Sequence, residues 1–362
     1  MRSRHKKSPE RVRPEAGPGG AFPDSRARAA ALAASLVVLA ALAACAPASP
    51  EAAAPDSTGS DGTSAGYPVT VTNCGTDVTL AAPPERIVTV KSSATEMVLA
   101  LGLGDRLVGT AFWDGPLPEW LAGTGSDLPV IAERAPSSEV VLELDPDLVY
   151  AGWESTFSPA AAGERQMLAD LGVASYVAPA ACKDPSHQPN PLTYEEVFRE
   201  ISEAGALLGV PEAAAELVAE QRDRLRALAP STAGLRALWY SSGSSTPYVG
   251  AGIGAPQMIL EAARLENIAA DVPDTWASLS WEAVAERDPD VIVLVDASWN
   301  TARNKMAVLA GNATTAALRA VREERYLVLP FAATEAGVRS VAAAESLISQ
   351  LAELEAPGGE AP

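Results

Sequence analysis

The sequence predicts an α/β fold with two lobes, each built on a mostly parallel sheet and joined by one long helix. From Tyr67 onward, short apolar runs alternate with helical patterns, as expected where helices cover the faces of parallel sheets. Two long, charged helical patterns interrupt this alternation in the middle of the chain. The length of 362 residues also allows two domains, at roughly 150 residues per domain.

In the N-terminal lobe, predicted over residues 67–210, a short hairpin around Cys74-Gly75 comes first. The β-branched run 86–90 predicts the next strand, and the helical stretch 94–101 after it ends at a glycine, a common signal at a helix C-terminus. The remaining elements alternate in the same way: strands at 106–110, 147–150 and 174–177, and helices at 139–144 and 164–171.

The two lobes are predicted to be joined by residues 211–229, which follow a helical pattern at 194–208. The joining helix opens with Pro211, a residue favoured in the first helical turn. The C-terminal lobe is predicted over residues 230–362, where strands and helices alternate again: strands at 236–240, 291–295 and 326–329, and helices at 256–265, 281–287, 314–321 and 338–354.

The N-terminal sequence predicts an export signal. Residues 1–44 carry a net charge of +5, and their last 16 residues are an uncharged apolar run, too short for a membrane span of about 20 residues. This run ends in Leu42-Ala43-Ala44-Cys45, which resembles a bacterial lipobox and predicts lipidation of Cys45; an ordinary signal peptide is the alternative. Residues 45–66 have the composition of a flexible tether. We therefore expect a lipid-anchored protein on the outer face of the cell membrane.

The composition excludes several functions. Residues 45–362 carry a net charge of −24, which argues against nucleic-acid binding. Only two histidines are present, so no metal site is expected, and no motif calls for a cofactor. In an exported chain Cys74 and Cys182 are predicted to form a disulfide, with two buried free thiols as the alternative.

Both lobes contain a glutamate followed six residues later by Asp-Pro-Asp and a strand. The first copy begins at Glu139 and the second at Glu282. The Asp-Pro-Asp segments are expected to be helix-to-strand turns, because proline ends a helix. The two glutamates open short surface helices at equivalent places, which suggests two anchor points for a two-fold partner.

Candidate ligand contacts follow the predicted strands, because ligands of open α/β sheets bind beyond the carboxyl ends of the strands. These positions are unusually rich in Trp and Tyr: Lys91, Ser92, Trp113, Trp153, Tyr240, Ser241 and Trp299. A planar ring system held between Trp153 and Trp299 or Tyr240 would fit. Phe331 and Trp239 are expected to cap the core instead. Lys91 is interpreted equally well as a ligand-neutralising cation and as a solvated surface lysine.

An enzyme is not expected. Ser241 and Ser242 lack the Gly-x-Ser-x-Gly elbow, and His187 would have to serve any acid–base scheme alone. A cell-surface hydrolase is a distant alternative, and an adhesion or signalling lipoprotein is a third.

The sequence resembles the siderophore- and cobalamin-type substrate-binding proteins of ABC importers. The likeness is carried by residues 84–88, 94–109 and 145–149, and it continues through 281–282 and 288–292 to near Leu354. The resemblance implies two Rossmann-like lobes joined by a single rigid helix, with a ligand cleft between them. It implies a monomer that works with permease and ATPase subunits, with Glu139 and Glu282 meeting arginines of the permease. Arg339 matches a cleft-facing arginine, which together with Lys91 would neutralise a carboxylate or phosphodiester of the ligand.

A narrower resemblance rests on residues 150–155, 180–183, 238–243, 252–258 and 297–300. These segments are similar to an actinobacterial branch described as importers of a deazaflavin coenzyme precursor. The implied ligand is this precursor, a planar and anionic small molecule. An iron–siderophore or a corrinoid is the alternative ligand.

Overall fold

The computed structural model describes residues 66–125 and 127–356, all of which belong to one compact unit, residues 61–362. The predicted signal peptide, the lipidation site Cys45 and the tether up to residue 65 lie outside the described residues. Within the described part of the chain, no helix is both long and apolar enough to cross a membrane.

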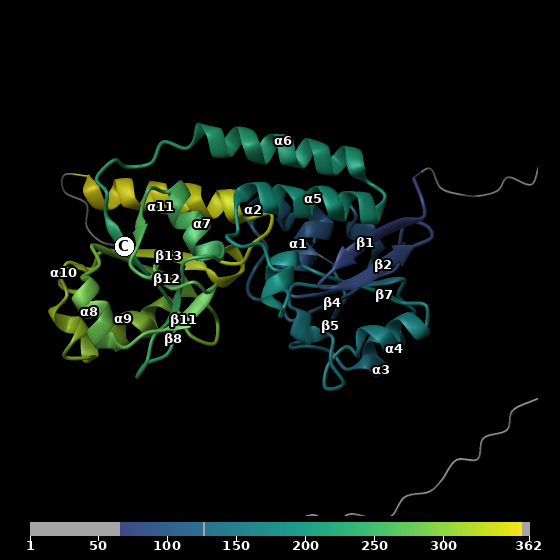
Figure 1. Ribbon diagram of the computed structural model, residues 1–362, viewed down its shortest axis with the longest axis horizontal. Helices are drawn as coiled ribbons and strands as arrows, with labels where there is room; N and C mark the ends of the chain where they lie inside the picture. The colour runs from purple at the N-terminus through teal and green to yellow at the C-terminus, as the bar shows by residue number, and fades with distance from the viewer. Residues whose placement is uncertain (1–65, 126, 357–362) are drawn as a thin grey trace, which may run out of the picture. The chain divides into compact units, whose positions relative to one another are not determined.

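The N-terminal lobe is built on a five-stranded sheet in the order β5-β4-β3-β6-β7, with every neighbouring pair parallel (Figure 1). All four residues of both β3 and β6 are buried, as expected for strands covered on both faces. The strands are β3 (Ile87–Val90), β4 (Leu107–Ala111), β5 (Val130–Ala132), β6 (Leu148–Ala151) and β7 (Ala174–Val177). The helices are α1 (Ser92–Ala100), α2 (Glu119–Ala122), α3 (Ser138–Leu142), α4 (Arg165–Asp170) and α5 (Tyr194–Leu208).

An antiparallel hairpin precedes this sheet, as predicted. It consists of β1 (Val69–Asn73) and β2 (Thr76–Leu80), and its turn contains Cys74. Cys74 forms the predicted disulfide with Cys182, at a Cα–Cα distance of 5.3 Å. The bond ties the hairpin to the loop that follows β7.

The C-terminal lobe contains a mixed sheet in the order β11-β9-β8-β12-β13, with β10 paired to β8. Strands β8, β10, β12 and β13 pair in parallel, whereas β9 is antiparallel to β8 and β11. The strands are β8 (Arg236–Ser242), β9 (Tyr248–Gly250), β10 (Glu266–Asn267), β11 (Trp276–Ser278), β12 (Val291–Asp296) and β13 (Tyr326–Pro330). The helices are α7 (Ala255–Ala262), α8 (Trp281–Arg287), α9 (Ala302–Gly311), α10 (Arg319–Arg322) and α11 (Ser340–Glu355). The α/β fold with mostly parallel pairing is confirmed.

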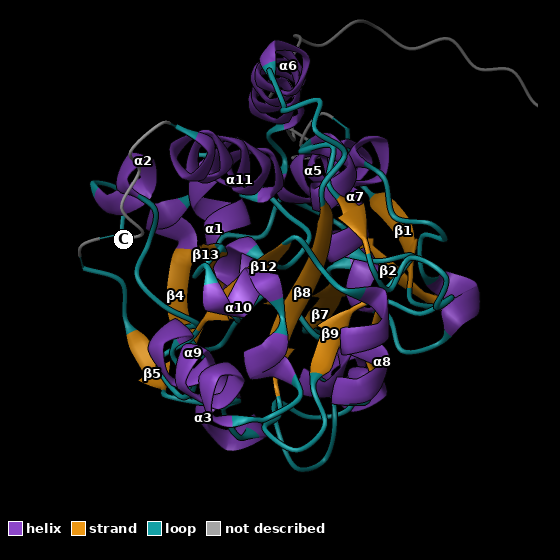
Figure 2. Cartoon of the chain, turned by 90° about the vertical axis from the view of Figure 1, so that its left-hand side faces the viewer, coloured by secondary structure: helices purple, strands orange, loops and turns teal. Residues whose placement is uncertain are grey.

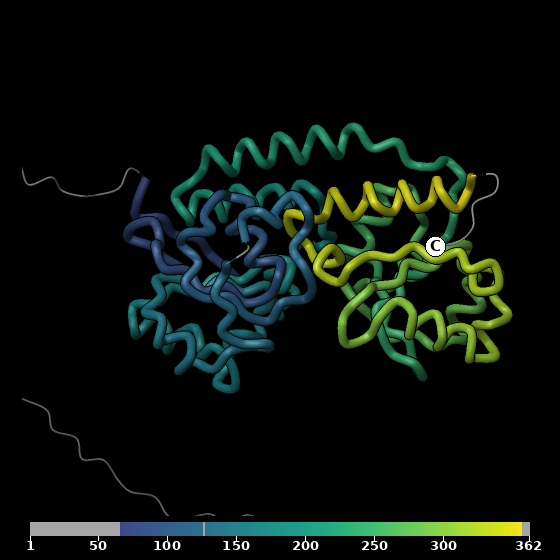
Figure 3. Tube along the Cα trace, turned by 180° about the vertical axis from the view of Figure 1, so that it is seen from behind, coloured from purple at the N-terminus to yellow at the C-terminus, as the bar shows by residue number. Residues whose placement is uncertain are grey.

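Helix α6 (Pro211–Ala227) occupies the stretch in which the joining helix was predicted. It packs against α5 and α11, and Figures 1 and 2 show it on the outside of both helices, away from the sheets. The tube in Figure 3 shows it extending over both lobes. Most of its residues face solvent, which explains its charged sequence; only Ala214, Leu217, Val218 and Gln221 are buried.

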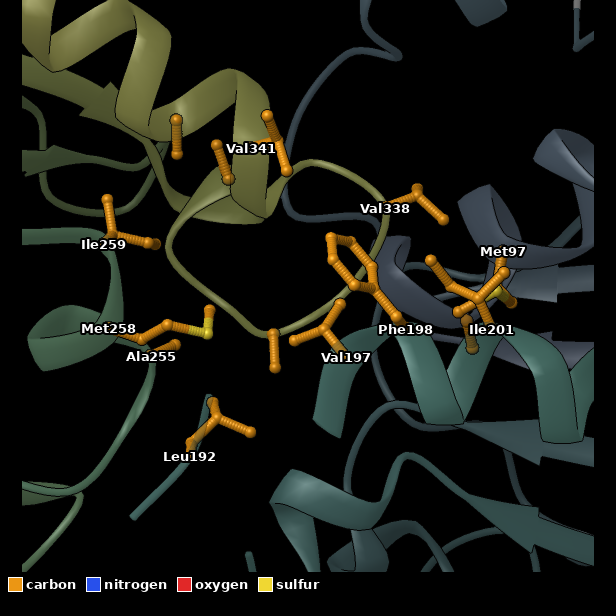
Figure 4. Packing of buried hydrophobic residues seen from close by; sticks show 14 of the residues in the cluster. Met97, Leu192, Val197, Phe198, Ile201, Ala255, Met258, Ile259, Val338 and Val341 are labelled. Atoms are coloured by element: carbon orange, nitrogen blue, oxygen red, sulfur yellow. The ribbon is translucent and has the colours of Figure 1, made fainter. Parts of the chain in front are cut away.

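One hydrophobic cluster extends through both lobes (Figure 4). Met97 of α1 and Phe198 of α5 belong to the same cluster as Met258 and Ile259 of α7, and Figure 4 shows Val338, in the segment before α11, beside Phe198 and Met97. The sheets therefore have separate topologies but share one hydrophobic cluster, and each lobe has a further cluster of its own.

The structure departs from the predicted elements mainly in short segments. Strands β5, β9 and β11 have three residues each and were not predicted, because a hydrophobic period cannot be recognised over three positions. The helix predicted at 314–321 is instead a 3₁₀ turn, Thr315–Ala317, followed by α10; the extended backbone of Leu318 separates them.

Candidate ligand-binding site

A cavity of about 580 Å³ lies between the ends of the two sheets. Five aromatic side chains line it. Trp153, Trp299 and Phe331 follow the carboxyl ends of β6, β12 and β13, while Tyr248 and Trp276 come from β9 and β11. The cavity therefore lies where ligands of open α/β sheets bind, and residues of both lobes form its wall.

The aromatic rings form two groups. Phe331 makes edge-on contacts with Trp299 and Trp153, at centroid distances of 5.0 and 6.4 Å. On the other strands, Tyr248 and Trp276 are stacked, with centroids 5.8 Å apart and planes 15° from parallel. Trp299 is 55% exposed and Tyr248 is 41% exposed, so large apolar faces are accessible from the cavity. Such faces suit a flat, apolar ring system.

A carboxyl group lies at the buried side of the cavity. Glu335 accepts a hydrogen bond from Trp153 Nε1 at 2.6 Å and from Ser93 Oγ at 3.2 Å. Its side chain is only 14% exposed. Burial raises the pKa of Glu335 to about 7, although the nearby Lys91 acts in the opposite direction.

Lys91 lies beneath the cavity and does not line it. Its Nζ is 3.7 Å from the ring centroid of Trp153 and 4.7 Å from that of Phe331, both favourable cation–π positions. It also forms an ion pair with the buried Asp114. The solvated surface position, one of the two interpretations of Lys91, is therefore wrong. Its role toward a ligand stays a prediction, and its charge is already paired with Asp114 inside the protein.

Arg339 requires a similar correction. It is 7% exposed and donates two hydrogen bonds to the carboxylate of Glu96, from Nε at 2.6 Å and from Nη2 at 2.5 Å. Nη2 also donates to the carbonyl oxygen of Pro116 at 2.8 Å. The guanidinium joins the two lobes and lies outside the cavity wall, so it is not a free ligand contact.

Three more of the predicted contacts lie elsewhere. Ser92 is buried, and its Oγ accepts from the backbone N–H of Asp114. Trp113 donates from Nε1 to Thr110. Tyr240 is in the core, where burial raises its pKa to about 12 and its hydroxyl donates to the carbonyl of Gly243 at 2.6 Å. The predicted contacts that do line the cavity are Trp153, Ser241 and Trp299.

Sequence reasoning missed several residues of the wall. Phe331 was expected to cap the core but lines the cavity, as its place at a strand end could have indicated. Tyr248 and Trp276 come from strands that were not predicted. No sequence pattern distinguished Glu335 from the other acidic residues of this acidic chain. Lys183, an exposed residue next to the disulfide, also lines the cavity and was not predicted to do so.

Glu139 and Glu282 occupy equivalent positions. Glu139 is the second residue of the short helix α3, and Glu282 is the second residue of α8. A serine caps the start of each helix: Ser137 accepts a hydrogen bond from the backbone N–H of Val140, and Ser280 accepts one from that of Ala283. Both glutamates are exposed. Hydrogen bonds from its own backbone and from Ser137 lower the pKa of Glu139. Figures 1 and 2 show α3 and α8 on the side of the molecule opposite α6.

In residues 66–125 and 127–356, His, Cys, Asp and Glu side chains form no group of three that could hold a metal ion. The aromatic cavity thus stands as the candidate site without a metal centre among the described residues.

Comparison with known proteins decides the family. Residues 87–333 match the sequence profile described as "Periplasmic binding protein". The chain belongs to this family. The curated relatives include a cobalamin-binding protein of Halobacterium salinarum, 33% identical over 63% of this chain. The alignment covers 58% of that relative's length. An uncharacterised ABC transporter substrate-binding lipoprotein of Bacillus subtilis, YvrC, is 25% identical, and the alignment covers 79% of this chain and 86% of the length of YvrC.

Solved structures of periplasmic binding proteins share the fold. One from Veillonella parvula is 26% identical with a TM-score of 0.68, and covers 78% of this chain and 97% of its own. The protein of an ABC-type Fe³⁺-hydroxamate transport system from Saccharomonospora viridis is 29% identical with a TM-score of 0.66, and covers 79% of this chain and 99% of its own. The named relatives are binding or transport proteins and not enzymes, in agreement with the expectation for this chain.

Proposed function

We propose that this protein captures a small, planar ligand outside the cytoplasm and delivers it to the permease of an ABC importer. The observation that carries this proposal is the cavity between the two sheets, with five aromatic side chains on its wall. Its volume of about 580 Å³ lies within the range of roughly 300–1,000 Å³ that is usual for small-molecule sites. The transport-related names of the relatives support the same function.

For the ligand itself we propose the deazaflavin coenzyme precursor. Its fused, planar ring system suits the accessible faces of Trp299 and Tyr248 and the edge-on rings of Trp153 and Phe331. A corrinoid is the alternative that the name of the halobacterial relative supports, and an iron–siderophore is the one that the Saccharomonospora structure supports.

A ligand screen on the purified protein tests this proposal. The probes are the deazaflavin precursor, cyanocobalamin and a ferric hydroxamate, each followed by thermal shift and by tryptophan fluorescence, since three tryptophans line the cavity. We expect the precursor to raise the melting temperature and to be recovered chemically unaltered. Tighter binding of either other probe would replace the proposed ligand, and a converted product would indicate an enzyme.

We further propose that the mature protein is a monomer anchored through a lipid on Cys45, and that Glu139 and Glu282 dock it to the permease and its associated ATPase. The equivalent, exposed positions of the two glutamates support docking to a two-fold partner. The order of signal, cysteine and tether in the sequence supports the anchor, as does the lipoprotein name of the Bacillus relative. The mass of the N-terminal peptide from membrane-extracted protein tests the anchor.

A further inference from the structure

Three charged side chains line the cavity: Glu335 is only 14% exposed, Lys183 is exposed, and Glu154 is half-buried beside the backbone of Lys183. We infer that the ligand binds with a hydrogen-bond-donating edge of its ring against Glu335 and with its anionic end beside Lys183. This inference rests on the proposed function and adds the orientation of the ligand and a residue that selects it.

Glu335 is held as an acceptor. Trp153 Nε1 can only donate, so the carboxylate oxygen that it contacts at 2.6 Å must accept. The second oxygen accepts from Ser93. A carboxylate offers about four lone-pair sites, so these two bonds leave acceptor capacity on a side chain that lines the cavity. A ring N–H or O–H of the ligand can use this remaining capacity.

Among the described residues, the buried side of the cavity offers no unpaired cation to an anionic group. Lys91 Nζ, 4.0 Å from Glu335, is paired with Asp114, and Arg339 is paired with Glu96. A phosphate or carboxylate placed here would meet the carboxyl group of Glu335 without an unpaired positive partner. An anionic ligand group here would face the ionised form of Glu335, and burial already raises the pKa of Glu335 to about 7, so this side disfavours a second anion.

Lys183 offers the complementary charge at the exposed side. It lines the cavity next to Cys182, whose disulfide to Cys74 fixes the loop. Its backbone N–H donates to the carboxylate of Glu154, which also lines the cavity. Among the described residues the side-chain ammonium group of Lys183 is in no ion pair, so it can meet an anion at the exposed side of the cavity.

A deazaflavin carries matching groups at opposite ends. The pyrimidinedione edge of the ring has an imide N–H, which can donate to Glu335. The phosphate ester and carboxylate of the coenzyme precursor are on the side chain, which would extend toward Lys183. Changes at Glu335 should therefore affect binding of the ring, and changes at Lys183 should affect binding of the anionic side chain.

The experiment measures the affinity of three probes by fluorescence titration: the phosphate-free 8-hydroxy-5-deazaflavin with a ribityl side chain, its N3-methyl derivative and the phosphate-bearing precursor. We expect Glu335→Gln to weaken binding of the phosphate-free deazaflavin and of the precursor by about tenfold or more. The amide oxygen of Gln must face Trp153, so its NH₂ group faces the donor edge of the ring. Methylation of the imide nitrogen should weaken binding to the unmodified protein to a similar extent. Lys183→Gln should weaken only the precursor, by up to about fivefold.

Glu353→Gln, an exposed change on α11, is the matched control and should leave all affinities unchanged. Melting curves establish whether Glu335→Gln folds; if it does not, the N3-methyl probe on the unmodified protein still tests the donor edge. Equal affinity for the phosphate-free deazaflavin and its N3-methyl derivative would overturn the inference while leaving the proposed function intact. Failure of the unmodified protein to bind any deazaflavin probe would overturn the proposed ligand and, with it, this orientation.

Discussion

Arg339 and Glu96 form a two-point ion pair that joins the lobes, with the guanidinium 7% exposed and Glu96 1% exposed. Replacing Arg339 with Ala should lower the free energy of unfolding by about 3–5 kcal/mol, because it leaves the carboxylate buried without a partner. Urea denaturation measures this loss. The double variant Glu96→Met with Arg339→Met should recover most of it, since no uncompensated charge remains. A small effect of the single variant would contradict a structural role.

The disulfide should stabilise the protein and also shape the cavity. Changing Cys74 and Cys182 to Ser removes a link between residues 108 positions apart, and we expect a loss of about 2–5 kcal/mol in unfolding free energy. Affinity for the ligand should fall as well, because Cys182 and Lys183 are part of the cavity wall. Chemical denaturation and a binding titration on the folded variant separate the two effects. Unchanged affinity would show that the loop keeps its place without the bond.

Glu200 should make stability depend on pH. It is buried on α5, its Oε1 accepts from the Tyr150 hydroxyl at 3.2 Å, and burial raises its pKa to about 8. A carboxyl group with a raised pKa in the folded state binds more protons than in the unfolded state. Its contribution to stability is therefore present below about pH 4.5 and is lost as the pH rises through about 8.

The variant Glu200→Gln should remove the part of this pH dependence that Glu200 causes, while the raised pKa of Glu335 still contributes with the same sign. At pH 9 we expect it to be more stable than the unmodified protein by on the order of a few kcal/mol, because a neutral amide need not be ionised in the interior. Melting temperatures between pH 5 and pH 9 measure the difference. Glu195→Gln, an exposed change on the same helix, is the control and should leave the pH profile unaltered.

Trp299 should matter for binding more than for folding. It is 55% exposed and lines the cavity, so Trp299→Ala should cost about 1–2 kcal/mol of binding free energy with little change in melting temperature. Trp120, 46% exposed on α2, is outside the cavity wall and provides the matched control. Equal effects of the two substitutions in a calorimetric titration would argue against stacking on Trp299.

The two exposed glutamates should affect transport without affecting ligand capture. Charge reversal at Glu139 and Glu282 together should reduce uptake in cells and binding to the detergent-solubilised permease by about tenfold or more, since two ion pairs become repulsive contacts. Ligand affinity should remain unchanged. Glu286→Lys, at an exposed position on the same helix as Glu282, is the control. Uptake that persists in the double variant would show that docking uses another surface.

The long, regular parts of the fold could be predicted from sequence. The buried strands β3 and β12 are continuous apolar runs. Helix α6 was predictable because Pro211 marks its first turn and its sequence carries many charges. Helix α9 was missed because its apolar residues do not form a clear stripe, although Thr301 caps it and could have marked its start. Local periodicity is thus sufficient for elements that bury a face and insufficient for elements of one turn or three residues.

The candidate site was harder to predict, because it depends on partners that are distant in sequence. Trp153 and Trp299 were predicted from sequence and line the cavity, since a strand end fixes where a residue lies. The pairing of Lys91 and Arg339 could not be predicted, because Asp114 and Glu96, which neutralise them, lie 23 and 243 positions away in the chain. A cation is available to a ligand only if the fold leaves it unpaired, and no local pattern carries that information.

The shared interior limits how the two lobes can change independently. Phe198 of α5 and Met258 of α7 are 1% and 3% exposed and belong to one hydrophobic cluster with members from both halves of the molecule. A lobe exchanged with that of a relative would have to bring a matching half of this interior, or leave large apolar side chains in contact with water. New ligand preferences are therefore more accessible through single substitutions in the aromatic wall than through recombination of whole lobes.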